Sequence, residues 1–132
     1  LTFILDQSET INVSAGVHFF REGEVGKSFF VLTLGTVLIE KDWEGTAFKL
    51  RRMGIGDCFG EMTIIDLLGR SASVRAEADC QAIEISRTTI HQLYQQDLEQ
   101  YAILMMNMGR EVSRRLRLVS ERLFALEQTL PK

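Results

Sequence analysis

The stretch from Thr10 to Ile85 is divided into short apolar runs by turns that recur every several residues. The runs are rich in aromatic and β-branched residues, which favour strands over helices. Glycine adopts turn conformations that other residues avoid, and glycines stand at the predicted strand junctions: Gly16, Gly23, Gly35 and Gly56. Strands this short, separated by turns this frequent, predict an all-β sandwich or barrel.

Seven strands are expected in this stretch, at Thr10–Val13, Val17–Phe20, Ser28–Thr33, Thr36–Glu40, Ala47–Met53, Ser73–Ala78 and Cys80–Ile85. From Ser86 onward the apolar period becomes helical. Ser86 is the expected N-cap of a helix over Arg87–Gln95, and Asp97 that of a long helix over about Leu98–Thr129, which Pro131 ends. At 132 residues the chain has the size of one domain, with strands over about 9–86 and C-terminal helices over about 87–129. Its start without Met suggests a piece of a longer protein.

The sequence between Phe59 and Val74 carries the chemistry of the predicted binding site. Gly60 opens an apolar helical turn whose free N–H groups and dipole favour an anion. Arg70 supplies a planar fork of donors that matches two phosphate oxygens, and Glu61 supplies an acceptor for sugar hydroxyls. Together these groups predict a sugar-phosphate ligand. Taken singly, Arg70 is also typical of a solvated turn, and Glu61 of a charge in the first turn of a helix.

The run Phe59–Gly60–Glu61, several apolar residues, and then Arg70–Ser71–Ala72–Ser73–Val74 resembles the phosphate-binding cassette of cyclic-nucleotide-binding domains. The resemblance implies a mainly β fold, an antiparallel double-stranded jelly-roll β-barrel followed by a short helix and a long C-terminal helix. It also implies that Arg70 holds the cyclic phosphate and Glu61 the ribose 2′-hydroxyl, while amides near Ser71 and Ala72 complete the phosphate site. The ligand-contacting residues expected in the cassette are Gly60, Glu61, Met62, Arg70, Ser71 and Ala72.

The sequence departs from the family pattern in the cassette at Thr63, where Ala is frequent, and at Gly69, where many members have Pro. The change at Gly69 leaves the turn less rigid when it is empty. The role of Ser71 stays open at this point, because its hydroxyl could donate to the phosphate or to a guanine base, or could serve a β-bulge or turn.

The run from Ser113 to Glu121 resembles the bacterial catabolite-activator branch, in which a Thr-Ser pair at the matching place contacts adenine across a dimer. Only Ser120 carries this contact over, because Val119 stands in place of Thr. A buried base amine without a partner would cost about 1–3 kcal/mol. Cyclic AMP is the expected ligand and cyclic GMP the alternative.

The long helix carries apolar residues at alternating spacings of four and three: Val112, Leu116, Val119, Leu123, Leu126 and Leu130. This spacing is typical of a coiled-coil seam. We expect the seam to pair with a second copy of the chain, which would give a homodimer. The alternative is that the seam packs on the β domain of its own chain.

Other features narrow the function class. The net charge of −3 and the glutamates interspersed among the helix arginines argue against direct nucleic-acid contact. His18 and His91 are not at a metal-binding spacing, which disfavours a metal-dependent enzyme of the cupin type. Cys58 and Cys80 are isolated and predict reduced core thiols in a cytoplasmic protein. No apolar run reaches the length of a membrane helix.

We therefore expect a cytoplasmic regulatory domain, without catalysis, metal or membrane contact, that captures a cyclic mononucleotide and transmits the bound state through its C-terminal helix. The alternative is a nucleotide-independent dimerisation module, or one for another effector, on the same fold.

Overall fold

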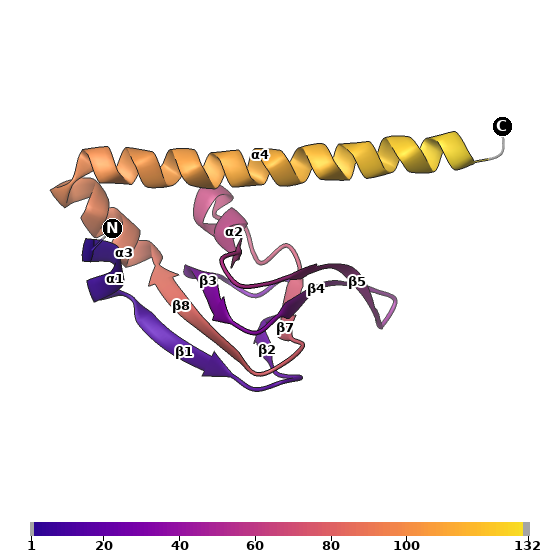
Figure 1. Cartoon of the computed structure of the whole chain (residues 1–132), viewed down its shortest axis with the longest axis horizontal. Coiled ribbons are helices and arrows are strands. Elements are labelled where there is room, and N and C mark those ends of the chain that lie inside the picture. Colours follow the sequence, from indigo (N-terminus) through magenta and orange to yellow (C-terminus); the bar gives the residue numbers. More distant parts are fainter. Residues whose placement is uncertain (1, 131–132) are drawn as a thin grey trace. The chain divides into compact units, whose positions relative to one another are not determined.

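A computed structural model describes residues 2–130 of the chain (Figure 1). These residues form two compact units, with the boundary between Leu93 and Tyr94. All of the described strands lie in the first unit, and the long C-terminal helix lies in the second. Among residues 2–130, no helix combines the length and the apolar character needed to cross a membrane.

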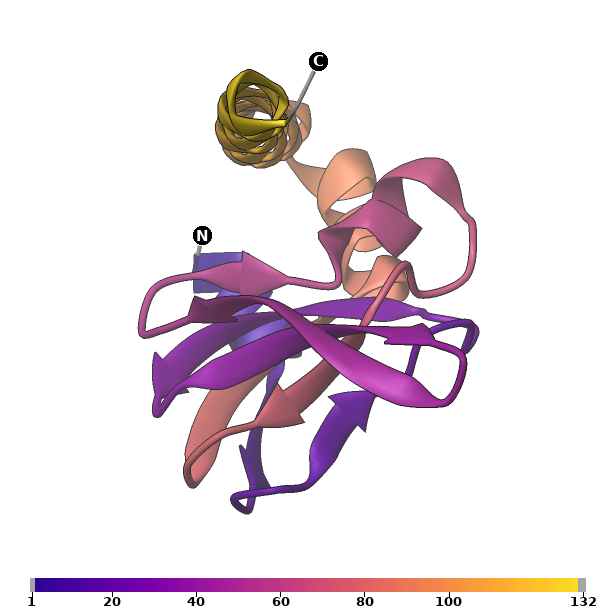
Figure 2. The same ribbon diagram turned by 90° about the vertical axis from the view of Figure 1, so that its right-hand side faces the viewer.

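The strands of the first unit pair into two antiparallel sheets of four, which Figure 2 shows facing each other. One sheet has the order β1 (Glu9–Val13), β8 (Cys80–Ser86), β3 (Ser28–Leu34) and β6 (Cys58–Phe59). The other has the order β2 (His18–Phe20), β7 (Ser73–Ala76), β4 (Val37–Trp43) and β5 (Thr46–Met53). The predicted antiparallel jelly roll is thus confirmed, as two facing sheets.

Side chains of both sheets meet in one hydrophobic core. Phe30 and Phe59 stack with ring centroids 5.3 Å apart, and Phe19 packs edge-on against both rings. From the opposite sheet the core receives Val37, Ile39, Met53, Val74 and Ala76. Full burial of each large apolar side chain contributes about 1.5–3 kcal/mol, so this core is a main source of stability for the first unit.

All seven predicted strands are present, and the turn glycines behave as expected. Gly35 joins β3 to β4 with a φ of 90°, and a Cβ there would lie 2.5 Å from the carbonyl oxygen of Asp79. β4 runs further than predicted, to Trp43, because it stays paired with β5 until the turn at Glu44 and Gly45. β6 and the short helix α1 (Thr2–Gln7) were not predicted from the sequence. A two-residue strand such as β6 is too short to show a periodicity.

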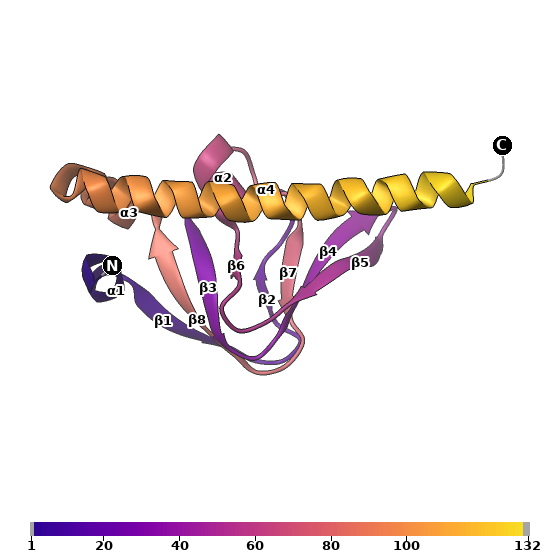
Figure 3. The same cartoon turned by 45° about the horizontal axis from the view of Figure 1, so that its top comes forward.

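The helices after the strands begin where their N-caps predicted. The Ser86 hydroxyl accepts the Thr89 N–H at 3.1 Å, at the start of α3 (Arg87–Gln96). The Asp97 carboxylate accepts the Gln100 N–H at 3.2 Å, at the start of α4 (Leu98–Thr129). α4 is one continuous helix, as Figure 3 shows. Pro131, expected to end it, lies outside the described residues.

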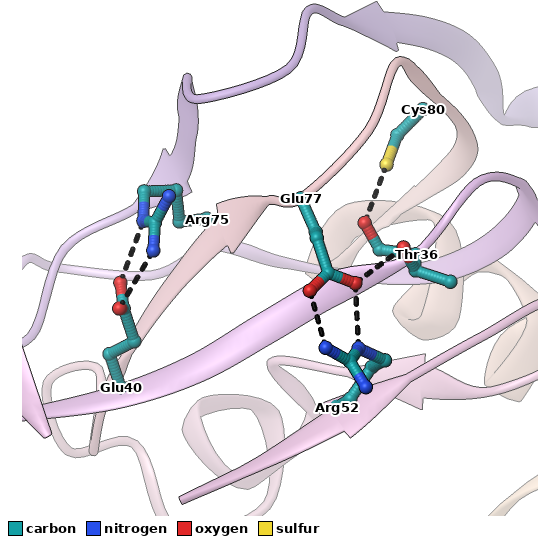
Figure 4. Close-up of polar contacts among 6 residues, drawn as sticks. All are labelled: Thr36, Glu40, Arg52, Arg75, Glu77 and Cys80. Atoms are coloured by element: carbon teal, nitrogen blue, oxygen red, sulfur yellow. Dashed lines mark hydrogen bonds and ion pairs between the residues drawn. The ribbon is translucent and has the colours of Figure 1, made fainter. Parts of the chain in front are cut away.

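Ion pairs tie the strands of the second sheet together (Figure 4). Arg75 on β7 donates to both carboxylate oxygens of Glu40 on β4, each at 3.0 Å. Arg52 on β5 donates to both oxygens of Glu77 at 2.6 Å, and the Thr36 hydroxyl donates to the same carboxylate at 3.0 Å. These contacts join three neighbouring strands and so help to fix the register of this sheet. The cassette leads directly into one of its strands, β7.

Candidate functional site

The cassette begins at a glycine in a left-handed conformation. Gly60 follows β6, has φ 84° and ψ 2°, and is the N-cap of the short helix α2 (Glu61–Asp66). A Cβ at Gly60 would lie 2.7 Å from Arg70 Nη1 and 3.2 Å from Phe20 Cε2. Gly60 therefore meets two requirements, a positive φ and a close approach of the Arg70 side chain to the backbone.

Arg70, which follows α2, turns its guanidinium inward. The residue is only 6% exposed, and its Nη1 donates to the Gly60 carbonyl oxygen at 3.0 Å. Its Cζ lies 4.0 Å from the centroid of the Phe20 ring, within the range of a cation–π interaction. Gly26 approaches from the loop before β3, where a Cβ would lie 2.5 Å from the same Cζ. The guanidinium thus occupies a seat bounded by two glycines and a phenyl ring.

This seat leaves Arg70 with an unused donor. Its Nε is buried and has no hydrogen-bond partner among the described residues. Burial lowers the pKa of Arg70, while the negative charges of Glu84 and Glu24 oppose that shift. A buried donor left unpaired costs about 1–3 kcal/mol, and more when it belongs to a charged group. An anion with oxygens at this fork would relieve the cost, so the seat fits a phosphate.

The main chain of Arg70 is fixed by the polar turn between β2 and β3, residues 22–27. Its N–H donates to the Glu24 carbonyl oxygen at 2.8 Å, and its own carbonyl accepts the Gly23 N–H at 2.8 Å. A Cβ at the preceding Gly69 would lie 3.1 Å from the Gly23 carbonyl oxygen. The two segments therefore run in close backbone contact, which positions Arg70 from both its main chain and its side chain.

The other predicted cassette residues lie in the same segment. Glu61 is buried at the start of α2, whereas Met62 is exposed. The Ser71 hydroxyl donates to Met62 Sδ at 3.6 Å, a weak acceptor, and Ala72 packs against the core. The structure therefore brings together the six expected cassette residues. Their contacts with a ligand stay predictions. So does the role of Ser120, which lies on α4 in the second unit.

Sequence reasoning missed three residues of this site. Phe20 lies beside the Arg70 guanidinium, and Gly26 approaches it from the loop. Arg87, at the start of α3, donates through Nη2 to the carbonyl oxygens of Gly26 and Thr63, each at 3.2 Å. Arg87 therefore joins the loop before β3 to the cassette helix. The polar, glycine-containing run from Glu22 to Lys27 is a weak sequence signal for Gly26, while nothing in the sequence pattern assigned Phe20 or Arg87 to the site.

A family profile described as "Cyclic nucleotide-binding domain" matches residues 10–97, more than half of the chain and the whole of the site described above. The chain belongs to the cyclic nucleotide-binding domain family. The resemblance seen in the cassette sequence is thereby confirmed at the level of the family, whose regulatory domains bind cyclic nucleotides.

Curated relatives include proteins named for either nucleotide. The domain is 33% identical over 84 residues to the cAMP-dependent protein kinase regulatory subunit of Emericella nidulans, which covers 64% of this chain and 20% of the relative. It is 35% identical over 95 residues to the human cGMP-dependent protein kinase 2, covering 70% of this chain and 12% of the relative. The chain thus spans a fifth or less of the length of these two proteins.

Solved structures share the fold over nearly the whole chain. A cyclic nucleotide-binding domain from Methylobacillus flagellatus superposes with a TM-score of 0.89 at 22% identity, covering 98% of this chain and 72% of that one. The catabolite activator protein of Thermus thermophilus superposes with a TM-score of 0.82 at 24% identity, covering 96% of this chain and 58% of that one. At these identities the likeness establishes the fold.

Within residues 2–130, no group of three or more His, Cys, Asp or Glu side chains is arranged to hold a metal ion. Arg70 interacts electrostatically with the carboxylates of Glu84, Glu24 and Glu61 and with the guanidinium of Arg87.

Proposed function

We propose that this domain is a cytoplasmic sensor that reversibly binds cyclic AMP, without catalysis, and passes the bound state on through its C-terminal helix. The observation that carries the proposal is the buried Arg70 guanidinium, seated between glycines with an unpaired Nε. A cyclic phosphate carries two exocyclic oxygens, which match the donor fork of an arginine.

In the proposed complex, Arg70 binds the phosphate, and amides near Ser71 and Ala72 complete its coordination. Glu61 accepts a hydrogen bond from the ribose 2′-hydroxyl, and Met62 lies beside the ligand at the start of α2. A hydrogen bond from a charged donor such as Arg70 contributes about 1.5–3 kcal/mol, so apolar contact with the base must supply much of the remaining affinity.

Cyclic AMP is preferred over cyclic GMP because of the likeness to the catabolite-activator branch and because Ser120 offers a hydroxyl to adenine. Relatives named for each nucleotide match the domain at similar identity, so ligand choice is decided by titration.

Signal transmission would begin at the Arg70–Gly60 contact. Phosphate oxygens compete with the Gly60 carbonyl for Arg70 Nη1, so binding alters the first residues of α2. Arg87, the first residue of α3, donates to the carbonyl oxygen of Thr63 in the middle of α2. A ligand that binds more tightly to one conformation of α2 than to another increases the population of that conformation. Because Arg87 links the two helices, α3 shifts with α2.

We also infer a homodimer formed through α4. Five of the six predicted seam residues are exposed, namely Leu116, Val119, Leu123, Leu126 and Leu130. A second copy of the helix would cover them in coiled-coil fashion, because it offers the same residues at the same spacing.

Isothermal titration of the domain with cyclic AMP and with cyclic GMP tests the proposal. We expect saturable binding of both, with the tighter dissociation constant for cyclic AMP. Tighter binding of cyclic GMP would overturn the ligand assignment alone. The absence of binding by either nucleotide to a dimeric domain would instead support the nucleotide-independent dimerisation module.

A further inference from the structure

Lys41 on β4 reaches the cassette from the side of the sheet. Its Nζ donates to the carbonyl oxygen of Ser71 at 2.9 Å and lies 3.0 Å from Glu22 Oε2. Ser71 is the residue that directly follows Arg70. A single ammonium group therefore joins the β4–β5 hairpin, the polar turn after β2 and the cassette.

Glu22 is itself held in place by neighbouring backbone. Its Oε1 accepts the Asp42 N–H at 3.2 Å, and its own N–H donates to the Ser73 hydroxyl at 2.9 Å. The hydrogen bond from Lys41 and that from the Asp42 amide lower the pKa of Glu22, because both favour the ionised carboxylate. Lys41 thus points at the Ser71 carbonyl from an anchored position, although its side chain is half-exposed.

The bond to the Ser71 carbonyl has a consequence for the next amide. In a trans peptide the C=O of one residue and the N–H of the next point to opposite sides of the chain. All described peptide bonds are trans. By holding the Ser71 carbonyl toward the hairpin, Lys41 fixes the Ala72 N–H in the opposite direction, away from the hairpin.

We propose that Lys41 is a positioning residue of the phosphate subsite, which orients the Ala72 amide for the anion without touching the ligand. This inference rests on the proposed function, since it takes the Ser71–Ala72 amides to be part of the phosphate site. Residues 67–72 form no helix or strand. Backbone hydrogen bonds of Arg70 and the pairing of Ser73 with Glu40 hold the chain on either side of the Ser71–Ala72 peptide, and the hydrogen bond from Lys41 acts on the Ser71 carbonyl itself.

A purely structural role for Lys41 would appear as a change in stability, whereas the positioning role appears as a change in nucleotide affinity. Ion pairs between exposed side chains contribute only about 0–1 kcal/mol to stability. Loss of the Lys41–Glu22 pair should therefore leave the melting temperature nearly unchanged, whereas loss of the oriented amide should weaken nucleotide binding. The two roles separate when affinity and stability are measured on the same variants.

The test compares Lys41→Met and Lys41→Arg with Lys49→Met. Lys49 lies on β5 of the same hairpin, is exposed and lies across from Glu40, so its replacement removes an equal charge without touching the cassette. For each protein, calorimetry gives the dissociation constant of cyclic AMP and cyclic GMP, and thermal unfolding gives the melting temperature. Amide NMR follows the Ala72 N–H as nucleotide is added.

We expect Lys41→Met to weaken binding about 3- to 10-fold, because one orienting hydrogen bond is lost. Lys41→Arg should restore affinity to within about twofold, since arginine can donate to the same carbonyl, and Lys49→Met should also stay within about twofold. The Ala72 amide should shift strongly with nucleotide in the unaltered domain and less in Lys41→Met.

Equal affinities for Lys41→Met and Lys49→Met would overturn the positioning role while leaving the sensor function intact. Failure of the unaltered domain to bind either nucleotide would overturn the proposed function and this role with it. If Lys41→Met unfolds, the unaltered domain still decides the matter. An Ala72 amide signal that does not move on nucleotide binding then contradicts the proposal.

Discussion

The guanidinium of Arg70 donates a 3.0 Å hydrogen bond to the carbonyl oxygen of Gly60, at the other end of the cassette. The expected phosphate ligand and the backbone of α2 therefore compete for one donor. Nε, on the same guanidinium, has no partner among the described residues and is free to gain one. On phosphate binding the guanidinium would exchange one neutral acceptor, the Gly60 carbonyl, for two charged oxygens. Ligand binding would therefore change the contacts of Gly60 directly.

Replacement of this side chain tests the site most directly. We expect Arg70→Ala to weaken binding of the preferred nucleotide by about 10- to 150-fold, which corresponds to the loss of a charge-assisted hydrogen bond of about 1.5–3 kcal/mol. Calorimetry measures the affinity, and circular dichroism shows whether the sheets are retained. Arg52→Ala is the matched control, because Arg52 binds Glu77 on the sheet rather than the cassette. Equal affinities of the two variants would refute the assigned role of Arg70.

Gly26 offers a test of the seat around the guanidinium. In Gly26→Ala the new methyl group would lie 2.5 Å from Arg70 Cζ and 2.8 Å from Thr63 Cγ2, so either side chain has to move. We expect weaker nucleotide binding together with a destabilisation of about 1–3 kcal/mol, as for overpacked cores. Denaturant unfolding and titration measure the two effects. Gly54→Ala is the control, since a Cβ there meets nothing within 4 Å; matching behaviour of the two variants would argue against a tight seat.

The Glu40–Arg75 pair predicts how stability depends on pH. The two hydrogen bonds from Arg75 lower the pKa of Glu40 in the folded domain, so the folded state binds this proton less readily than the unfolded state does. The stabilisation is therefore complete above the unfolded pKa of about 4.3 and is lost as the pH falls through the lower folded value. Thermal unfolding of the unaltered domain and of Glu40→Gln, from neutral to acid pH, measures this contribution.

At neutral pH we expect Glu40→Gln to be less stable by about 1–2 kcal/mol, because Arg75 loses its charged partner. The difference between the two proteins should shrink below about pH 4.3. A difference that stays constant into acid, or grows, would show that the ion pair is not its source.

The seam on α4 predicts a concentration-dependent dimer. We expect Leu123→Glu to shift the domain toward monomer in sedimentation velocity, because it places a charge in the middle of the apolar seam. Gln128→Glu adds the same charge at an exposed position of the same helix outside the seam, and should leave the assembly unchanged. A monomeric unaltered domain, or an intact Leu123→Glu dimer, would contradict pairing through this seam.

The parts that the sequence predicted are those that depend on local signals. Ser86 and Asp97 are side-chain caps, which act on amides three residues away, so the local sequence predicts both. The cassette is also predictable from local sequence, because Gly60 and Arg70 lie within one short segment. The glycine turns and the strands between them follow from residue type and spacing alone.

The surroundings of Arg70 could not be predicted, because they come from distant parts of the chain. Phe20 reaches the cassette through the pairing of β2 with β7, whose register shifts between His18 and Phe20, and Lys41 reaches it through the pairing of β4 with β7. Gly26 approaches it from the loop between β2 and β3. Arg87 arrives from the start of α3. The extent of the domain and the contact of Ser120 with a base stay predictions.

The carbonyl oxygen of Thr63 accepts from the Leu67 N–H at 3.0 Å and from Arg87 Nη2 at 3.2 Å, so both of its lone pairs are engaged. If α2 gained or lost a turn, one of these donors would have to give way. An insertion or deletion in the loop that follows α2 would then disturb α3, some twenty residues downstream, by a path through space rather than along the chain. A change in the length of this loop would consequently alter the mechanical coupling between the cassette and α3.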